Sequence, residues 1–296
     1  MCQVKLLLGT ATIFLFTIIS IFGSNPGDRA SIDKRTEFRV YNDNNEETSS
    51  RHCSKFKRYA IIVHGFQESC KTFWVKELRK NLIEHRGGCI ICMDYSAYND
   101  DYRYLVLKFK SIAKVLKNKL YELRDKSFSS NQAYLFGFSF GSRLISRAAF
   151  KFGPKQIGTI HLCDPAGPGF RRGNTEPRLA AQNSQCIHTD SKNHGTEERM
   201  CNQDWHLGKC GECQIAAGPK PLGNHGLCPV FYNLAFKYKF MAVKKCKVCD
   251  KPINLRDLQD LPSEGIRMGY FQTIPNSSRF SEVNLYANTK ADPPYV

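Results

Sequence analysis

Between residues 58 and 163 the chain alternates between short apolar runs and longer segments with a helical apolar stripe. The short runs span residues 58–64, 89–94, 132–138 and 157–163. The striped segments span residues 72–85, 103–124 and the residues that follow Ser139. Short runs rich in β-branched and aromatic residues are typical of strands buried on both faces. Their alternation with helices predicts an α/β fold built on a mostly parallel sheet.

The segments before and after this pattern indicate export and a single large domain. Residues 5–23 form an apolar run that begins at Lys5 and ends in small residues, which is typical of a secretory signal peptide. A membrane anchor is the alternative, but the run is near the lower length limit for a span. We therefore expect residues 1–23 to be a signal peptide, residues 24–57 a polar N-terminal arm, and residues 58–296 the main α/β domain. Beyond residue 165 the chain is richer in Gly, Pro and Cys, which predicts long loops tied by disulfides.

Cysteine usage agrees with a secreted, extracellular protein. Of the 13 cysteines only Cys2 lies in the predicted signal peptide, which leaves an even number. An even count in a secreted chain indicates disulfides, although their connectivity stays open. C-x-x-C pairs occur at 89/92, 210/213 and 246/249, and in a cytosolic chain the last two would suggest a zinc site. Asn276-Ser277-Ser278 matches a glycosylation acceptor.

The formal net charge of +16 favours anionic partners such as phospholipid surfaces or heparin-like glycans. Export argues against nucleic acid. The densest basic cluster is either a patch that binds an anionic surface or an ordinary solvated surface. It consists of Lys237, Lys239, Lys244, Lys245 and Lys247.

The pattern Gly137-Phe138-Ser139-Phe140-Gly141 follows a predicted strand and opens a predicted helix. A nucleophile elbow needs this strand–turn–helix setting, because the sharp turn presents the serine hydroxyl and requires small flanking residues. The helix behind the turn adds a favourable dipole for developing negative charge. Ser139 is therefore the candidate nucleophile.

A catalytic serine needs a base and an orienting acid, which follow it in the order acid then histidine in this type of fold. Asp164 ends the next predicted strand, where open α/β sheets place their sites. Spacing alone does not choose the base among the later histidines. These are His188, His194, His206 and His225. The oxyanion hole is expected from the backbone N–H groups of Phe140 and of Phe66, which follows the first predicted strand.

Ordered motifs over about residues 58–296 resemble the animal neutral lipases related to pancreatic lipase, in particular the insect secreted lipases and phospholipases A1. They are IIVHGF (61–66), GFSFG (137–141), CDPAGPGF (163–170), RLAAQNSQCIHTD (178–190), GNHGLC (223–228) and VNLYANTKADPPYV (283–296). The resemblance implies an α/β-hydrolase fold with Asp164 as the catalytic acid and His225 as the catalytic histidine, before a helix that contains Tyr232. It gives His188 a structural role. Phe138, Phe140, Cys163 and Asn224 depart from the family's usual residues.

The segment before His225 is shorter than in the pancreatic-type triacylglycerol lipases, and this is the most informative departure from the family. The interval from Asp190 to His225 is only 35 residues, and residues 194–213 contain no amphipathic apolar stretch, so we expect a very short lid or none, and no C-terminal β-sandwich domain. Within the family this resembles the phospholipase A1 branch. The resemblance implies a serine ester hydrolase that acts on lipid at a membrane or lipid-aggregate surface without metal or organic cofactor. The alternatives are a triacylglycerol or galactolipid lipase, and a non-catalytic lipid-binding protein of the yolk type.

Overall fold

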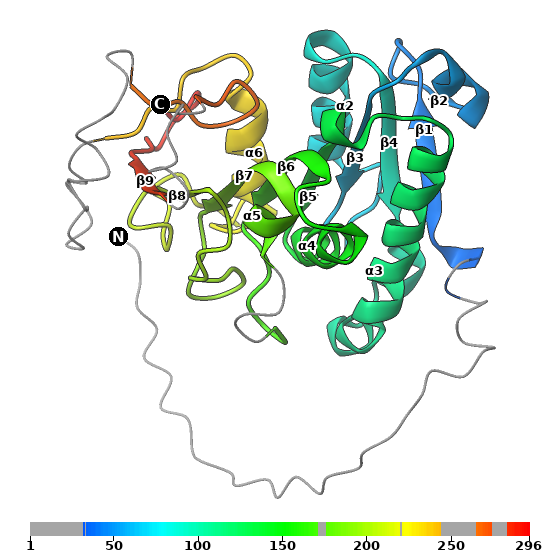
Figure 1. The fold of residues 1–296 in the computed structure, drawn as a ribbon. Coiled ribbons are helices and arrows are strands. Elements are labelled where there is room, and N and C mark those ends of the chain that lie inside the picture. Colours follow the sequence, from blue (N-terminus) through cyan, green and yellow to red (C-terminus); the bar gives the residue numbers. More distant parts are fainter. Residues whose placement is uncertain (1–31, 33, 171–175, 220, 244–264, 274–282) are drawn as a thin grey trace, which may run out of the picture.

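Nine strands form one mixed sheet in a computed structural model that describes residues 32, 34–170, 176–219, 221–243, 265–273 and 283–296 (Figure 1). The strand order is β2-β1-β4-β3-β5-β6-β7-β8-β9. From β4 to β9 every neighbouring pair is parallel, whereas β1 pairs antiparallel with both β4 and β2. The predicted α/β class is confirmed.

The strands are β1 (Glu37–Tyr41), β2 (Glu47–Thr48), β3 (Tyr59–Val63), β4 (Cys89–Asp94), β5 (Tyr134–Phe138), β6 (Ile157–Cys163), β7 (Ala181–His188), β8 (Gln203–Leu207) and β9 (Val283–Ala287). The α-helices are α2 (Phe73–His85), α3 (Tyr102–Asp125), α4 (Phe140–Phe152), α5 (Pro177–Ala180) and α6 (Leu227–Leu234). Short 3₁₀ turns are η1 (Ser50–Lys55), η2 (Ser96–Tyr98) and η3 (Ser130–Gln132). The strands and helices predicted between residues 58 and 163 are all present.

The sheet separates two hydrophobic cores. Alternate residues of β3 show this division, because Tyr59, Ile61 and Val63 face the core that contains α3 and α4, whereas Ala60 and Ile62 face the core that contains α2 and α6. Figure 1 shows these helix pairs on opposite faces of the sheet. All five β3 residues are fully buried, as the continuous apolar run predicts for a central parallel strand.

The expectation of a polar arm before residue 58 is wrong for part of that segment. Residues 37–41 form β1, which pairs with β4 at one edge of the sheet, and residues 47–48 pair back onto β1. Charged side chains lie on the outer part of this edge, where Arg39 contacts Glu37 and Glu47. Charged residues are common on edge strands because they discourage pairing with a second chain, and this composition hides the strand from a search for apolar runs.

The region after residue 165 is also more regular than expected. Strands β7, β8 and β9 extend the parallel sheet beyond β6. A disulfide joins Cys186 in β7 to Cys201, so the predicted disulfide-tied character of the region is confirmed together with the extra strands. The predicted signal peptide, the acceptor Asn276 and Lys244, Lys245 and Lys247 lie outside the described residues. Among the residues that are described, no helix is long and apolar enough to cross a membrane.

Parallel strands bring their carboxyl ends to one edge of the sheet. Val63, Asp94, Phe138, Cys163 and His188 are the last residues of β3, β4, β5, β6 and β7. The segments that directly follow these strands carry the proposed site residues Phe66, Ser139, Phe140 and Asp164, whereas His225 lies two residues before α6. Polar groups gathered at this edge are the usual basis of a site in an open α/β sheet.

Candidate active site

Ser139 occupies the sharp turn between β5 and α4. Its φ of 54° and ψ of −118° are strained for a residue with a Cβ. The two flanking glycines allow this turn. A Cβ on Gly137 would lie 2.8 Å from the backbone of Ser142, and one on Gly141 would lie 2.3 Å from the carbonyl oxygen of Val63. Ser139 therefore has the backbone of a nucleophile elbow, with its hydroxyl presented at the start of α4.

Asp164 follows β6 and is fully buried, with a φ of 40°. Its Oδ1 accepts hydrogen bonds from the backbone N–H groups of Thr189 (3.1 Å) and Asp190 (3.3 Å), which follow β7. Its Oδ2 lies 2.5 Å from Nδ1 of His225. The backbone donors hold one oxygen of the carboxylate, so the other is aimed at the histidine ring.

His225 connects this acid to the serine. Its Nε2 lies 2.8 Å from the Oγ of Ser139, while Nδ1 faces Asp164. With Asp164 ionised, Nδ1–H donates to the carboxylate and Nε2 accepts the serine hydroxyl proton. The ring packs on Phe138, with centroids 4.8 Å apart, and its side chain is 19% exposed. The structure thus brings Ser139, His225 and Asp164 together as one hydrogen-bonded chain.

A disulfide links the acid to the base through the backbone. Cys163, directly before Asp164, is bonded to Cys228 in the first turn of α6, three residues after His225. The link closes a loop across a sequence separation of 65 residues. Such a crosslink mainly restricts the unfolded chain, by about 2–4 kcal/mol. It also fixes the distance between the two elements that carry the His–Asp pair.

The two expected oxyanion donors, Phe66 and Phe140, follow β3 and β5, which are neighbouring strands. Phe140 is the first residue of α4, where a backbone N–H has no partner inside the helix. Phe66 follows β3 and Gly65. The ring of Tyr102 packs edge-on against both Phe66 (5.2 Å) and Phe140 (6.1 Å). Tyr102 therefore packs against the side chains of both donor residues and helps to hold the two segments next to each other.

The loop of residues 64–72, here called the oxyanion loop, is held by side chains that sequence reasoning missed. Glu68 accepts the Gly65 N–H and the Trp74 Nε1–H, each at 2.7 Å. Burial raises the pKa of Glu68 above its ordinary value, by more than these two donors lower it. Asn99 donates to the carbonyl oxygens of Gly65 and Glu68. These bonds fix the turn on which Phe66 lies.

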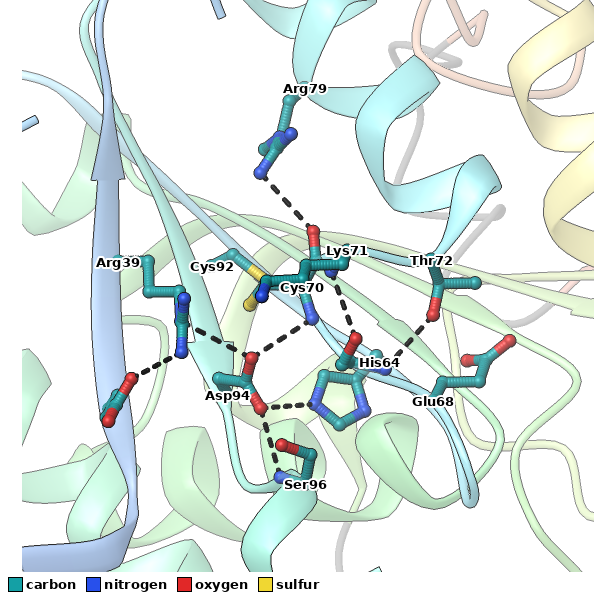
Figure 2. Close-up of a disulfide and its surroundings, with 12 residues drawn as sticks. Arg39, His64, Glu68, Cys70, Lys71, Thr72, Arg79, Cys92, Asp94 and Ser96 are labelled. Carbon is teal, nitrogen blue, oxygen red and sulfur yellow. Dashed lines mark hydrogen bonds and ion pairs between the residues drawn. A yellow bond between two sulfur atoms is a disulfide. The ribbon is translucent and has the colours of Figure 1, made fainter. Parts of the chain in front are cut away.

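Asp94 anchors both ends of the oxyanion loop (Figure 2). Its carboxylate accepts the Cys70 N–H at 3.3 Å and lies 3.6 Å from Nε2 of the fully buried His64. Burial alone would raise the pKa of Asp94, but hydrogen bonds from His64 and Ser96 outweigh it and hold the pKa far below the usual range. Arg39 lies 3.4 Å away as a balancing cation. The Cys70–Cys92 disulfide ties the same loop to β4.

The remaining histidine candidates lie elsewhere. His188 is buried with Nε2 3.1 Å from Oδ1 of Asp204 and its ring stacked on His206, which agrees with the structural role expected for it. His206 contacts the side-chain oxygen of Asn284 at 3.3 Å. His194 packs against the ring of His225, with centroids 5.4 Å apart. Of these four histidines, His225 is the one hydrogen-bonded to Ser139.

Disulfides, not a metal, engage the cysteines that the structure describes. The C-x-x-C pair at 89/92 is split between two bridges, Cys53–Cys89 and Cys70–Cys92. Cys210 and Cys213 are both disulfide-bonded. Cys246 and Cys249 lie outside the described residues, and within the described part no cluster of three or more His, Cys, Asp or Glu side chains could hold a metal ion.

A parallel sheet with a strained serine after β5 and a buried acid after β6 defines the α/β-hydrolase class. The sequence profile of the family called Lipase matches residues 31–211, which is more than half of the chain. The chain therefore belongs to the Lipase family, as the motifs in the sequence predict. The match begins before residue 58, in agreement with the position of β1 in the sheet.

Individual relatives cover the chain only in part. Lipase member H of Rattus norvegicus is 27% identical over 156 residues, which is 51% of this chain and 34% of that protein. Phospholipase A1 member A of Homo sapiens is 26% identical over 187 residues, 60% of this chain and 37% of that protein. Pancreatic triacylglycerol lipase of Mus musculus is 29% identical over 147 residues, 46% of this chain and 30% of that protein. The chain thus spans about a third of the length of these relatives.

Among solved structures, the chain is similar to a phospholipase/carboxylesterase from Dyadobacter fermentans, with a TM-score of 0.41 and 13% identity. That similarity covers 55% of this chain and 76% of the other. An α/β serine hydrolase without a lid from Xanthomonas campestris has a TM-score of 0.38 and 14% identity, over 55% of this chain and 68% of the other.

Proposed function

We propose that the chain is a serine carboxylic ester hydrolase that acts on lipids, and that its substrate is a glycerophospholipid from which it releases a fatty acid as a phospholipase A1. The observation that carries this proposal is the continuous chain from Ser139 Oγ to His225 (2.8 Å) and on to Asp164 (2.5 Å). Membership of the Lipase family and the similarity to Phospholipase A1 member A support the choice of lipid esters.

The proposed reaction follows from the hydrogen bonds that join Ser139, His225 and Asp164. The Oγ of Ser139 attacks the ester carbonyl carbon while Nε2 of His225 takes the hydroxyl proton. Asp164 stays ionised and stabilises the imidazolium through Nδ1–H. The carbonyl oxygen becomes negative, and in this proposal the N–H groups of Phe66 and Phe140 donate to it. His225 then gives its proton to the leaving alcohol, and water hydrolyses the acyl-serine by the same steps in a second cycle.

The segment between Asp190 and His225 favours a phospholipid over a neutral lipid. In its described residues, 191–219 and 221–224, it contains the short strand β8 and turns but no helix that could cover Ser139. A site without a helical cover admits a polar head group. The disulfides support an oxidising, extracellular location. The basic side chains of Lys237 and Lys239 are exposed and would favour an anionic lipid surface.

The test compares mature wild-type protein with Ser139→Ala on phosphatidylcholine, phosphatidylserine and triolein, with products identified by mass spectrometry. Ser146→Ala is the matched control, because Ser146 is buried in α4, the helix that follows Ser139, and its hydroxyl donates to the carbonyl oxygen of Ser142. We expect 2-acyl lysophospholipid from the wild type and from the control, and a loss of at least about 10⁴-fold in the Ser139 variant.

Each other outcome selects an alternative. Serine-dependent diacylglycerol from triolein alone would contradict the phospholipase assignment and indicate a triacylglycerol lipase. In the same assay with a galactolipid as a fourth substrate, serine-dependent release from that lipid but not from phosphatidylcholine would indicate a galactolipid lipase. Equal products from wild type and Ser139→Ala on every substrate, with lipid binding retained, would indicate a non-catalytic lipid-binding protein.

A further inference from the structure

A second histidine–aspartate pair lies beside the catalytic one. Nδ1 of His194 lies 2.8 Å from Oδ2 of Asp190, and the ring of His194 lies 5.4 Å from that of His225, inclined by 30°. The two members of the pair differ in exposure. The side chain of His194 is 58% exposed, whereas that of Asp190 is 4% exposed. The imidazole is therefore the solvent-facing end of the pair, next to the catalytic ring.

The segment that carries His194 is fixed to the catalytic carboxylate. The backbone N–H of Asp190 donates to Asp164 at 3.3 Å, and the His194 carbonyl oxygen accepts the Gly167 N–H at 2.9 Å. A Cβ on Gly195 would lie only 2.5 Å from Oδ1 of Asp164. The backbone therefore passes directly against the catalytic acid, and only glycine fits there. The position of His194 relative to Asp164 is thus set by backbone contacts on both sides of the residue.

The pair is arranged to present positive charge. Burial alone would raise the pKa of Asp190, but hydrogen bonds from His194 and Asn193 outweigh it and hold that pKa below its usual value. An ionised carboxylate at hydrogen-bond distance favours the protonated form of a histidine. The carboxylate also accepts from Asn193 Nδ2 at 2.7 Å. An anion that approaches from solvent therefore meets the His194 ring before it meets the buried acid.

The two histidines are close enough to contact two groups of one glycerophospholipid. The leaving oxygen of the sn-1 ester receives its proton from His225 in the proposed reaction. In an extended glycerol, with ordinary bond lengths and staggered torsions, that oxygen and the phosphorus are roughly 5–6 Å apart. The rings of His194 and His225 pack against each other, with centroids 5.4 Å apart. A phosphate on the same glycerol is therefore within reach of His194 while the ester lies at His225.

We propose that His194 is a specificity-determining residue, whose imidazolium, held by Asp190, attracts the phosphate of a glycerophospholipid while His225 serves the sn-1 ester. This inference rests on the proposed ester hydrolase function. It names the chemical group by which the site would distinguish a phospholipid from a neutral diester, namely the anionic phosphodiester shared by different head groups.

The test measures kcat/KM for two water-soluble substrates, dihexanoylphosphatidylcholine and dihexanoylglycerol, which carry the same acyl chains and differ in the phosphocholine group that bears the phosphate. For His194→Gln we expect kcat/KM on the phospholipid to fall about tenfold, as for loss of one charge-assisted contact, with the neutral diester unchanged. His194→Lys restores a cation and should recover part of the phospholipid rate. The matched control is Lys192→Gln, because Lys192 is a 59% exposed cation of the same segment that pairs with Glu212, and it should leave the ratio of the two rates unchanged.

An equal fall on both substrates would overturn the proposal, because it would mean that His194 supports the site only structurally. No change on either substrate would also overturn it. Binding to the Ser139→Ala protein provides a measurement that does not need turnover. In the Ser139→Ala protein, the added substitution His194→Gln should weaken dihexanoylphosphatidylcholine binding and leave dihexanoylglycerol binding unchanged. Equal binding of dihexanoylphosphatidylcholine by Ser139→Ala with and without His194→Gln would contradict the inference. Failure of the ester hydrolase proposal itself is seen separately, as wild-type rates on both substrates that equal those of Ser139→Ala.

Discussion

Two of the histidine–aspartate pairs at this edge of the sheet, His225 with Asp164 and His64 with Asp94, have different surroundings. His225 lies 2.5 Å from Asp164, and His64 lies 3.6 Å from Asp94, with β3 and β5 between the two acids. In both pairs the acid directly ends or follows a parallel strand. The pairs differ at the second ring nitrogen. Nε2 of His225 faces the Ser139 hydroxyl, whereas Nδ1 of His64 faces the carbonyl oxygen of Gly65 at 2.9 Å.

The comparison teaches that a His–Asp pair takes its function from the group at the far side of the ring. A hydroxyl there can be deprotonated, and the pair can act as a general base. A carbonyl there can only accept a hydrogen bond, so the pair holds a backbone turn. The ring of His64 is also stacked on Tyr95 at 4.3 Å and fully buried, as suits a fixed anchor. We therefore assign proton transfer to the pair of His225 and positioning of the oxyanion loop to the pair of His64.

The largest expected difference in kcat is between variants of His225 and of His64. His225→Gln should lower kcat by about 10⁴–10⁶-fold, because it removes the base next to Ser139. His64→Gln should lower kcat by no more than about 100-fold, since it disturbs an oxyanion donor but leaves the base in place. Ester hydrolysis rates, with circular dichroism to check folding, would measure both. Equal losses in two folded variants would break the comparison.

The two acids give the next largest difference. Asp164→Asn should lower kcat by about 10⁴-fold, because an amide opposite Nδ1 favours the wrong tautomer of His225. Asp94→Asn should lower kcat by less than about tenfold in protein that remains folded, because Asp94 contacts His64 and Cys70 of the oxyanion loop and is not in the hydrogen-bonded series of Ser139, His225 and Asp164. Initial rates at saturating substrate would measure both variants. If Asp94→Asn lost as much activity as Asp164→Asn, Asp94 would belong to the proton-transfer machinery and the assignment would be wrong.

Glu68 sharpens the role of the oxyanion loop. Its carboxylate accepts two N–H groups at 2.7 Å, from Gly65 and Trp74. In Glu68→Gln the amide NH₂ faces one of these donors, so the turn before Phe66 should loosen. We expect kcat to fall by about 10–100-fold, with KM changed by less than about twofold, since the oxyanion forms only in the transition state. Trp74→Phe, which removes one donor but keeps a ring, should show a smaller effect in the same direction. A change confined to KM would contradict this role.

The smallest effect concerns stability at low pH. Because the pKa of Asp94 is lowered in the folded protein, the unfolded chain binds the proton more readily. The stabilisation by this carboxylate is therefore complete above the ordinary Asp pKa of about 3.9 and is lost as the pH falls below it. Asp94→Asn should cost about 1–3 kcal/mol at neutral pH. Urea unfolding between about pH 3 and pH 7 should show a shallower decline for the variant than for the wild type. Parallel curves would show that Asp94 is not held as an ionised anchor.

Much of the catalytic edge could be predicted from the sequence, because its signals are local. The strand before Ser139, the helix after it and the two glycines lie within a few residues of one another, and steric limits on the turn fix their spacing. Asp164 follows from the same logic at the end of the next strand. The choice of His225 among four histidines came from family resemblance, since no local rule states which distant loop returns to the serine.

The parts that sequence reasoning missed depend on contacts between distant segments or on polar strands. Strand β1 is short and charged, so its residues resemble a surface arm until β4 is present to pair with it. Asp94 reaches His64 and Cys70 only because β3 and β4 are neighbours in the sheet. His194 lies beside His225 although 31 positions separate them in the sequence. The residues around His194 in the sequence do not indicate this contact.

Labelling with an alkyl fluorophosphonate tests the central claim most directly. Such a reagent forms a tetrahedral adduct on a serine that has both an activating base and an oxyanion hole. The wild type should gain one adduct, mapped by peptide mass spectrometry to Ser139, and His64→Gln should gain the same adduct more slowly. His225→Gln should remain unlabelled on that timescale. An adduct on another serine, or equal labelling rates for wild type and His225→Gln, would contradict the account.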